Sequence, residues 1–240
     1  MSILIGHAVG DENGKAHGGV AGDQKNEVCT RKWYNGNWSY VLRCKDPEKA
    51  EIMAKACEDG CANKNVGYDQ YQRNTLRKQA QIYGYDLSKV ATPCECDCSS
   101  FVTVCVECAG IKIPYNDGNA PTTKTMLKAF DSTGMFETLL GMEHIASYLK
   151  LRRGDILVRP GSHTVMVLED GPEAYPVNCF PKYTGKSGSI VDALKAVGAN
   201  STFTYRAKIA KINNVKLYAG TAKQNLKLLA LLKQGTLLKP

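Results

Sequence analysis

The sequence predicts an α+β fold followed by a small helical domain. Two observations predict it. Several segments before residue 131 place apolar residues at helical spacing, whereas residues 153 to 171 change to the two-residue period of strands. Beyond Tyr183 three further segments, 189–197, 205–213 and 221–234, return to helical spacing, which predicts a separate helical module.

The N-terminal half is predicted to hold loops, few strands and three main helices. The first forty residues are rich in glycine and turn residues, so we expect loops around one or two strands. A helix is predicted to start at Pro47, after an aspartate cap, and to stop at Gly60. A second helix is expected over about 71–83. The third begins at Cys98, buries one face and ends at Gly110.

The pattern changes after two shorter helices, predicted over 121–130 and 144–149. Residues 156–158 and 163–168 then read as strands separated by a tight turn. Asp170-Gly171 is the strongest short hairpin signal in the chain. We therefore expect the chain after it to return antiparallel to the 163–168 strand.

The net charge of +8 is distributed unevenly. Residues 182–240 hold eleven basic residues and one acid, a net charge of +10, which leaves −2 for the rest. Prolines and glycines cluster over 172–187, so we place the boundary there, with domains 1–178 and 179–240. The basic domain suits a polyanion such as nucleic acid, anionic lipid or wall teichoic acid. Few aromatics and no base-reading motif argue against nucleic acid.

Membrane and export signals are absent from the pattern. No run approaches the roughly 20 apolar residues of a membrane span. The start lacks a basic region and a long apolar core, so it does not resemble a signal peptide. We expect synthesis in the cytoplasm and, for work outside the cell, release by another route.

Cys98 is the candidate nucleophile. It opens a predicted helix, where unpaired N–H groups favour a thiolate and lower the thiol pKa below about 8.5. The competing interpretation is that Cys98, one of ten cysteines, is a small core residue. We expect most of the ten to be free thiols.

His163 is the candidate base. It opens the strand 163–168, and an imidazole there could take the thiol proton and return it to a leaving amine. A histidine in this position could also be structural. Paired with a helix-capping cysteine, the catalytic interpretation is favoured.

The third catalytic residue is open between two candidates. A two-residue hairpin turn at Asp170-Gly171 would place Asn178 opposite His163, where an amide oxygen could fix the imidazole tautomer. Prolines in the returning segment weaken that pairing. Glu169, on the His163 face of the strand, is the alternative.

Three motifs in this order resemble the NlpC-type and CHAP peptidoglycan hydrolases: residues 97–101 (DCSSF), 153–157 (RGDIL) and 163–167 (HTVMV). The segments DENGKAHGGVAGDQ, RKWYNGNW, NVGYDQYQRNTL and YTGKSGSIVDALKAVG resemble endolysins of phages and mobile elements of gut clostridia. Ser100 stands where these families often have glycine, and the third catalytic residue has no clear match.

This resemblance implies a papain-like fold, hydrolysis of an amide in the stem peptide or cross-bridge of peptidoglycan, and a wall-binding tail. No cofactor is implied. Specificity for the N-acetylmuramoyl-L-alanine amide is an alternative to endopeptidase action. The alternative from another class is a non-catalytic wall-binding or adhesion protein.

Several further residues are candidates for substrate or oxyanion contacts. Tyr68 precedes the nucleophile at the place where the resembled enzymes supply a tyrosine, and Asp97 adjoins Cys98. Asp23 and Gln24 could line a groove, and Glu169 joins this group. Zinc is the chemical alternative, held by thiolates of Cys94, Cys96, Cys98, Cys105 and Cys108. Alternating cysteines give poor tetrahedral geometry, so we predict no metal.

Overall fold

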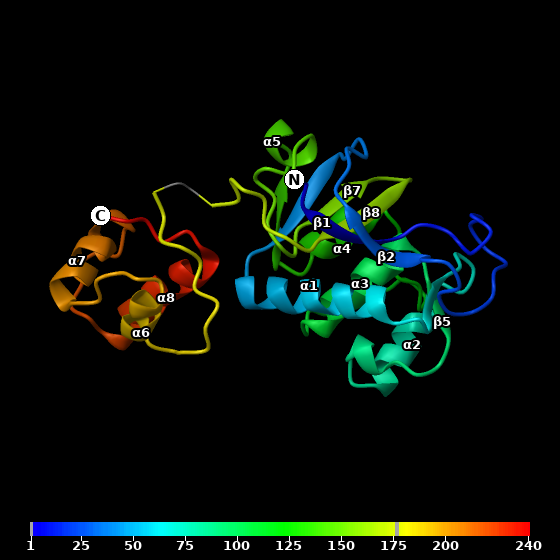
Figure 1. Cartoon of the computed structure of the whole chain (residues 1–240), viewed down its shortest axis with the longest axis horizontal. Coiled ribbons are helices and arrows are strands. Elements are labelled where there is room, and N and C mark those ends of the chain that lie inside the picture. The colour runs from blue at the N-terminus through cyan, green and yellow to red at the C-terminus, as the bar shows by residue number, and fades with distance from the viewer. Residues whose placement is uncertain (1, 176–177) are drawn as a thin grey trace. The chain divides into compact units, whose positions relative to one another are not determined.

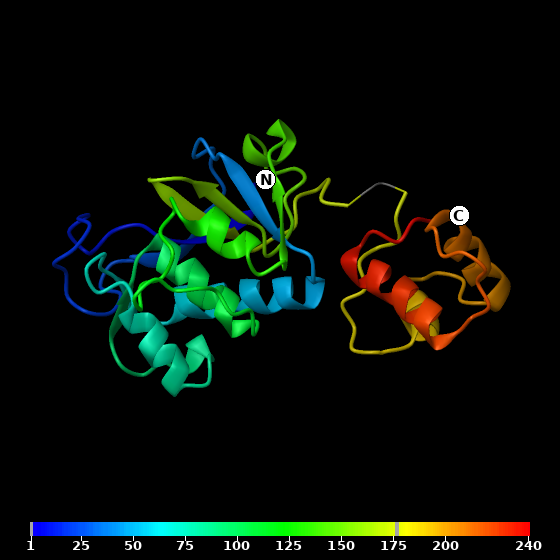
Figure 2. The same ribbon diagram turned by 180° about the vertical axis from the view of Figure 1, so that it is seen from behind.

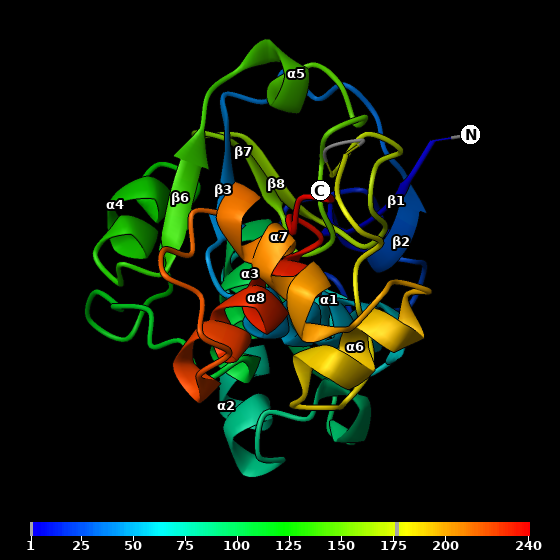
Figure 3. The same ribbon diagram turned by 90° about the vertical axis from the view of Figure 1, so that its left-hand side faces the viewer.

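A six-stranded sheet lies at the centre of the first of two compact units, Met1–Ala174 and Tyr175–Pro240. The computed structural model describes residues 2–175 and 178–240. The sheet order is β2-β1-β8-β7-β3-β6, and each neighbouring pair is antiparallel (Figure 1, Figure 3). The strands are β1 (Leu4–Ala8), β2 (Val28–Lys32), β3 (Tyr40–Cys44), β6 (Phe136–Leu139), β7 (Ile156–Arg159) and β8 (His163–Val167).

The helices of this unit begin close to the positions expected from the sequence. They are α1 (Pro47–Ala62), α2 (Thr75–Ile82), α3 (Cys98–Cys108), α4 (Met126–Asp131) and α5 (Met142–Ile145), with a short 3-10 turn, η1 (Leu87–Lys89). A separate parallel pair joins β4 (Val66–Tyr68) to β5 (Cys94–Cys96). The α+β class is confirmed. Gly60 does not end α1, because it lies buried within the helix against the ring of Phe101.

Helices α1 and α3 pack on one face of the sheet. Their apolar sides share a core with residues of all six strands of the sheet, and α3 contacts both β1 and β8. Gly6 allows the close approach of α1, because a side chain there would collide with the sulfur of Cys57. A second apolar cluster, around Trp38 and Leu151, covers the opposite face. Strand β8, which begins at His163, is therefore covered by apolar clusters on both faces of the sheet.

The expected hairpin at Asp170-Gly171 does not form. One edge of β8 pairs with β7 and the other with β1, so neither is free for a returning strand. Asp170 instead accepts the N–H of Arg153, and the N–H of Gly171 donates to Leu151. The pairing that predicted Asn178 opposite His163 is wrong.

One buried ion pair joins β3, which lies next to the edge strand β6, to the turn before β7. The Nε and Nη2 groups of Arg43 donate to the two carboxylate oxygens of Asp155 at 2.8 and 2.6 Å. Asp155 is 1% exposed, and it also accepts the N–H of Arg152. The pair fixes the turn from which the β7–β8 hairpin emerges.

The second unit is helical, as expected, and has its own apolar core. Its helices are α6 (Ile190–Ala196), α7 (Phe203–Ile212) and α8 (Ala222–Gln234), drawn yellow to red in Figure 2. Ser189, Thr202 and Thr221 each cap one of them with a side-chain oxygen. The unit begins at Tyr175, four residues before the expected boundary.

Within residues 2–175 and 178–240, no helix is long and apolar enough to cross a membrane.

We expect Asp155→Ala to lower the free energy of unfolding by about 3–5 kcal/mol, because it leaves the buried guanidinium of Arg43 without its carboxylate. Urea denaturation followed by circular dichroism measures this loss. The control is Asp59→Ala, which breaks the exposed Lys55–Asp59 pair and should cost under about 1 kcal/mol. Equal losses in the two variants would contradict a structural role for the buried pair.

Candidate active site

The N-terminus of α3 is fixed by Asp97. Its carboxylate accepts the N–H of Ser100 at 2.7 Å, while the hydroxyl of Ser100 accepts the N–H of Asp97, which completes a capping box. Arg73 donates to the same carboxylate at 2.6 Å and to the hydroxyl of Ser99 at 2.8 Å. Asp97 is thus bonded on several sides, and it holds the first turn of α3 in place.

Cys98 is the first residue of α3 and points toward the start of β8. It is 7% exposed, and the backbone N–H groups of Thr164 and Ser99 act on its sulfur and lower the thiol pKa. Burial raises the pKa of the Cys98 thiol to about 12, and the adjacent Asp97 carboxylate raises it further. The expected thiolate is therefore not the resting form, because burial outweighs the helix N-terminus.

His163 opens β8 one residue before Thr164. Burial lowers the pKa of its imidazole to about 4, Arg31 lowers it further, and Asp97 raises it. The ring lies 6.1 Å from that of Trp38, centroid to centroid, and its Nε2 atom is buried with no hydrogen-bond partner among the described residues. At neutral pH both the imidazole of His163 and the thiol of Cys98 are therefore neutral.

His7, on β1, is a site residue that the sequence alone did not indicate. It is 2% exposed, and its ring meets that of His163 edge to face, with centroids 5.7 Å apart. Burial lowers its pKa to about 4, as do His163 and Arg31. Its Nδ1 atom also has no partner within the part of the chain described. Only the pairing of β1 with β8 brings His7 here, and no local pattern reports that pairing.

Two tyrosines lie near Cys98. Tyr68, on β4, is 5% exposed, and its hydroxyl accepts the side-chain amide of Gln70 at 3.0 Å. Burial raises its pKa to about 12, and Cys98 and Asp97 raise it further. Burial raises the pKa of Tyr34, Arg31 lowers it, and Cys98 raises it. Tyr68 and Tyr34 are therefore both within electrostatic influence of the thiol, and Tyr34 was not predicted.

Gln24 and Asp23 belong to a loop that folds onto β4 and β5. The Gln24 side chain donates to carbonyls of its own loop, at Ala21 and Gly22. Asp23 is buried and pairs with Lys64 at 2.6 Å. These bonds stabilise the loop itself. No contact among the described residues brings Gln24 to Cys98.

Of the two candidates for the third residue, one is far from His163 and the other belongs to the second unit. Glu169 accepts the N–H of Leu4 at 2.8 Å, beyond the far end of β8. Six residues of extended chain separate it from His163, about 20 Å, which is too far for a hydrogen bond. Asn178 belongs to the second unit, where its carbonyl accepts the N–H of Lys239.

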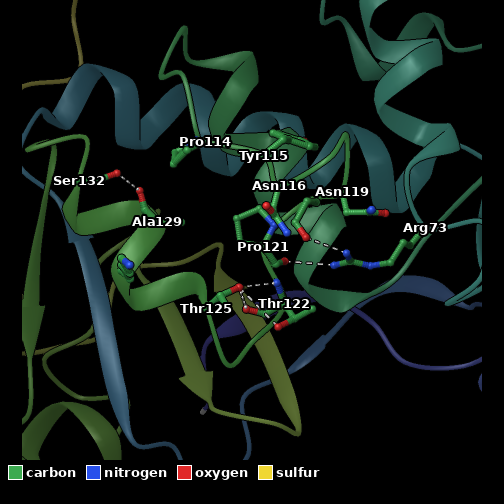
Figure 4. A pocket seen from close by; sticks show the side chains of 12 residues that line it. Arg73, Pro114, Tyr115, Asn116, Asn119, Pro121, Thr122, Thr125, Ala129 and Ser132 are labelled. Carbon is green, nitrogen blue, oxygen red and sulfur yellow. Dashed lines mark hydrogen bonds between the residues drawn. The ribbon is translucent and has the colours of Figure 1, made fainter.

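A pocket of about 550 Å³ adjoins the cap of α3 (Figure 4). Arg73 lines it and reaches the carbonyls of Ala120 and Pro121. Thr123, in the same segment, accepts the N–H of Gly161 in the β7–β8 turn at 3.0 Å. The wall of the pocket is thus tied both to the Cys98 helix and to the turn before His163.

The ten cysteines are all free. Cys94 and Cys96 donate to backbone carbonyls on β4 and its approach, at Asn65 and Gly67. Among the residues with described placement, no three His, Cys, Asp or Glu side chains are grouped to hold a metal ion.

The comparisons with known proteins give one match. The model of the endolysin-like domain family matches residues 5–174, which is more than half of the chain. No curated protein and no solved structure matches significantly. The matched residues coincide almost completely with the first compact unit and include Cys98, His163 and His7.

We expect the stability advantage of the parent over His7→Gln to shrink as the pH falls from about 6.5 to about 4. The buried imidazole resists protonation until its pKa of about 4, whereas the unfolded chain takes up the proton near pH 6.5. This contribution to the free energy of unfolding, about 3 kcal/mol, is fully present above pH 6.5 and is lost gradually as the pH falls to about 4.

Urea denaturation of both proteins at several pH values measures the difference. Glu95, whose pKa burial raises to about 7, acts with the opposite sign but is common to both proteins. A stability difference that does not change with pH would contradict a neutral buried His7.

Proposed function

Since the chain belongs to the endolysin-like domain family, which indicates a cell-wall lytic function, we propose that it is a cysteine-type peptidoglycan hydrolase. Cys98 is the nucleophile and His163 the base, as in the NlpC-type and CHAP enzymes that its motifs resemble. The substrate is an amide in the stem peptide or cross-bridge, and the enzyme reaches the wall after release.

The observation that supports this most is the meeting of α3 with β8. Helix α3 contacts β8, the backbone N–H of Thr164 lowers the pKa of the Cys98 thiol, and Thr164 is the neighbour of His163. Asp97 influences the pKa of both Cys98 and His163, which places all three in one electrostatic environment. This arrangement supports a nucleophile and a base that come from two separate elements, α3 and β8.

The reaction starts from the neutral pair. As the sulfur attacks the carbonyl carbon of the scissile amide, the thiol proton passes to His163 and a tetrahedral oxyanion forms. The C–N bond then breaks, and His163 gives the proton to the departing amine. Water attacks the thioester with His163 again as base, and Cys98 leaves with that proton. Tyr68 and the N–H groups at the start of α3 are the candidate donors to the oxyanion.

His7 is the positioning residue in place of Asn178 and Glu169. Its edge-to-face contact restricts rotation of the His163 ring, and its unpaired Nδ1 can accept an N–H when His163 carries the extra proton. Its low pKa keeps His7 neutral, so it does not repel the imidazolium.

The second unit docks the enzyme on an anionic wall polymer. This unit contains eleven basic residues and only one acidic residue, Asp192. No nucleic acid is proposed as a partner.

The alternative is a non-catalytic wall-binding or adhesion protein with an inert Cys98. Burial of the thiol is compatible with it, but the edge-to-face contact of His7 with His163 has no role in simple adhesion. The family match also favours lysis. The lytic assay separates the two functions.

We expect Cys98→Ala to clear a suspension of purified bacterial walls at least about a thousandfold more slowly than the parent, because the nucleophile is removed. Turbidity measures the rate. Cys108→Ala, at the other end of α3, is the matched control and should lyse like the parent. Lysis by Cys98→Ala at the parental rate would rule out the mechanism, and mass spectrometry of the released fragments names the bond.

His7→Gln extends this assay. Glutamine retains an amide that can accept a hydrogen bond but not the edge-to-face ring contact, so kcat on a soluble fragment should fall while KM is unchanged. A change in KM alone would place His7 in substrate binding instead.

We expect wall binding to depend on the lysines of the second unit. In the Cys98→Ala background, replacing Lys211, Lys216 and Lys223 by Gln should weaken binding to purified walls roughly fivefold and flatten its salt dependence, because part of the attraction to a polyanion is lost. Sedimentation with walls at increasing NaCl measures both. The same number of Gln substitutions at Lys25, Lys78 and Lys112 is the control. Equal weakening in both sets would contradict docking by the second unit.

A further inference from the structure

Arg31 is an exposed cation next to the buried histidines. It lies on β2 and pairs with Ile5 of β1. Ile5 is two residues before His7, so Arg31 and His7 are on the same face of the sheet. Its guanidinium carbon lies 4.6 Å from the centre of the Tyr34 ring, an arrangement that favours a cation over the ring face. The side chain is therefore partly positioned although it is exposed.

No carboxylate of the described residues forms an ion pair with Arg31. Four other arginines of the first unit each have one: Arg43 with Asp155, Arg73 with Asp97, Arg77 with Glu107 and Arg153 with Glu51 and Glu58. Arg31 is thus a partly positioned, forked donor available to an acid from outside the chain.

The charge of Arg31 acts on the site itself. It lowers the pKa of both His7 and His163, and Tyr34, on which it lies, is influenced by Cys98. Arg31 therefore lies within electrostatic reach of the groups that would perform the cleavage.

We propose that Arg31 binds a free carboxylate of the wall peptide close to the scissile amide and so selects acidic over amidated peptides. This inference rests on the proposed hydrolase function and adds a specificity determinant to it. Peptides of the wall carry such carboxylates, and the planar guanidinium can take one in a bidentate manner.

Binding of the carboxylate has a second effect on the reaction. Four charged or titratable groups face His163: His7 against its ring, Asp97, Arg31, and Arg159, its register partner on β7. Of the two arginines, Arg31 is the one that lowers the pKa of His163. A substrate carboxylate paired with Arg31 cancels that positive field, so His163 accepts the thiol proton more readily. An acidic substrate should thus raise kcat as well as lower KM.

The test compares two soluble stem peptides that differ only in whether this carboxylate is free or amidated. For the parent, amidation should lower kcat/KM about fivefold, the contribution of a partly exposed ion pair. In Arg31→Met the preference should disappear, and the acid limb of kcat/KM should move to higher pH because His163 is relieved of a cation. Arg31→Lys should keep part of the preference.

Lys32→Met is the matched control. Lys32 adjoins Arg31 but pairs with Leu4, so it faces the other side of the sheet, and the same charge is removed there. It should discriminate between the peptides like the parent. An undiminished preference in Arg31→Met, or an equal loss in Lys32→Met, would overturn the proposal.

Failure of this inference and failure of the proposed function give different results. Calorimetric binding of both peptides to the Cys98→Ala protein measures the carboxylate preference without turnover. Lysis by Cys98→Ala would remove the hydrolase mechanism whatever Arg31 does. Loss of lysis in Cys98→Ala with equal binding of both peptides would remove only the role of Arg31.

Discussion

The carboxylate of Asp97 is the interaction on which the site depends. It caps α3, receives Arg73, and influences both the thiol that follows it and the imidazole of His163. Through Arg73 it also reaches the carbonyls at 120 and 121, and the same segment contacts the β7–β8 turn through Thr123. One partly buried carboxylate thus links the helix, the pocket wall and the hairpin that bears the histidine.

Burial decides the resting charge of this site. A helix N-terminus would favour a thiolate, but Cys98 is almost fully enclosed, and a charged sulfur there would lose more hydration than the helix returns. The same enclosure keeps both histidines neutral. Charge separation is therefore left to the moment when a substrate enters, and the cost of forming the ion pair becomes part of the barrier to reaction. A neutral thiol is also protected from oxidation while no substrate is bound.

Local patterns predicted the local structure well. The cap and apolar spacing after Asp97 located the start of α3, and the strands on either side of Gly161 were found from their two-residue period. The pairing of β1 with β8 was not predictable, because 155 or more residues separate the partners and no turn signal joins them. That omission explains the error at Asp170-Gly171, where a strong turn signal was taken to supply a partner that β8 already has.

The same omission explains which site residues were missed. Cys98 and His163 stand in local motifs, whereas His7 and Arg31 reach the site only through the pairing of β2 with β1 and of β1 with β8. The opening residues of the chain and the hairpin after 155 therefore have to pair before the imidazoles can meet. Because contacts at such separation form late in folding, the nucleophile's helix can be complete while the site is still unformed. The chemistry of the first unit is in this sense a property of its whole sheet and not of its motifs.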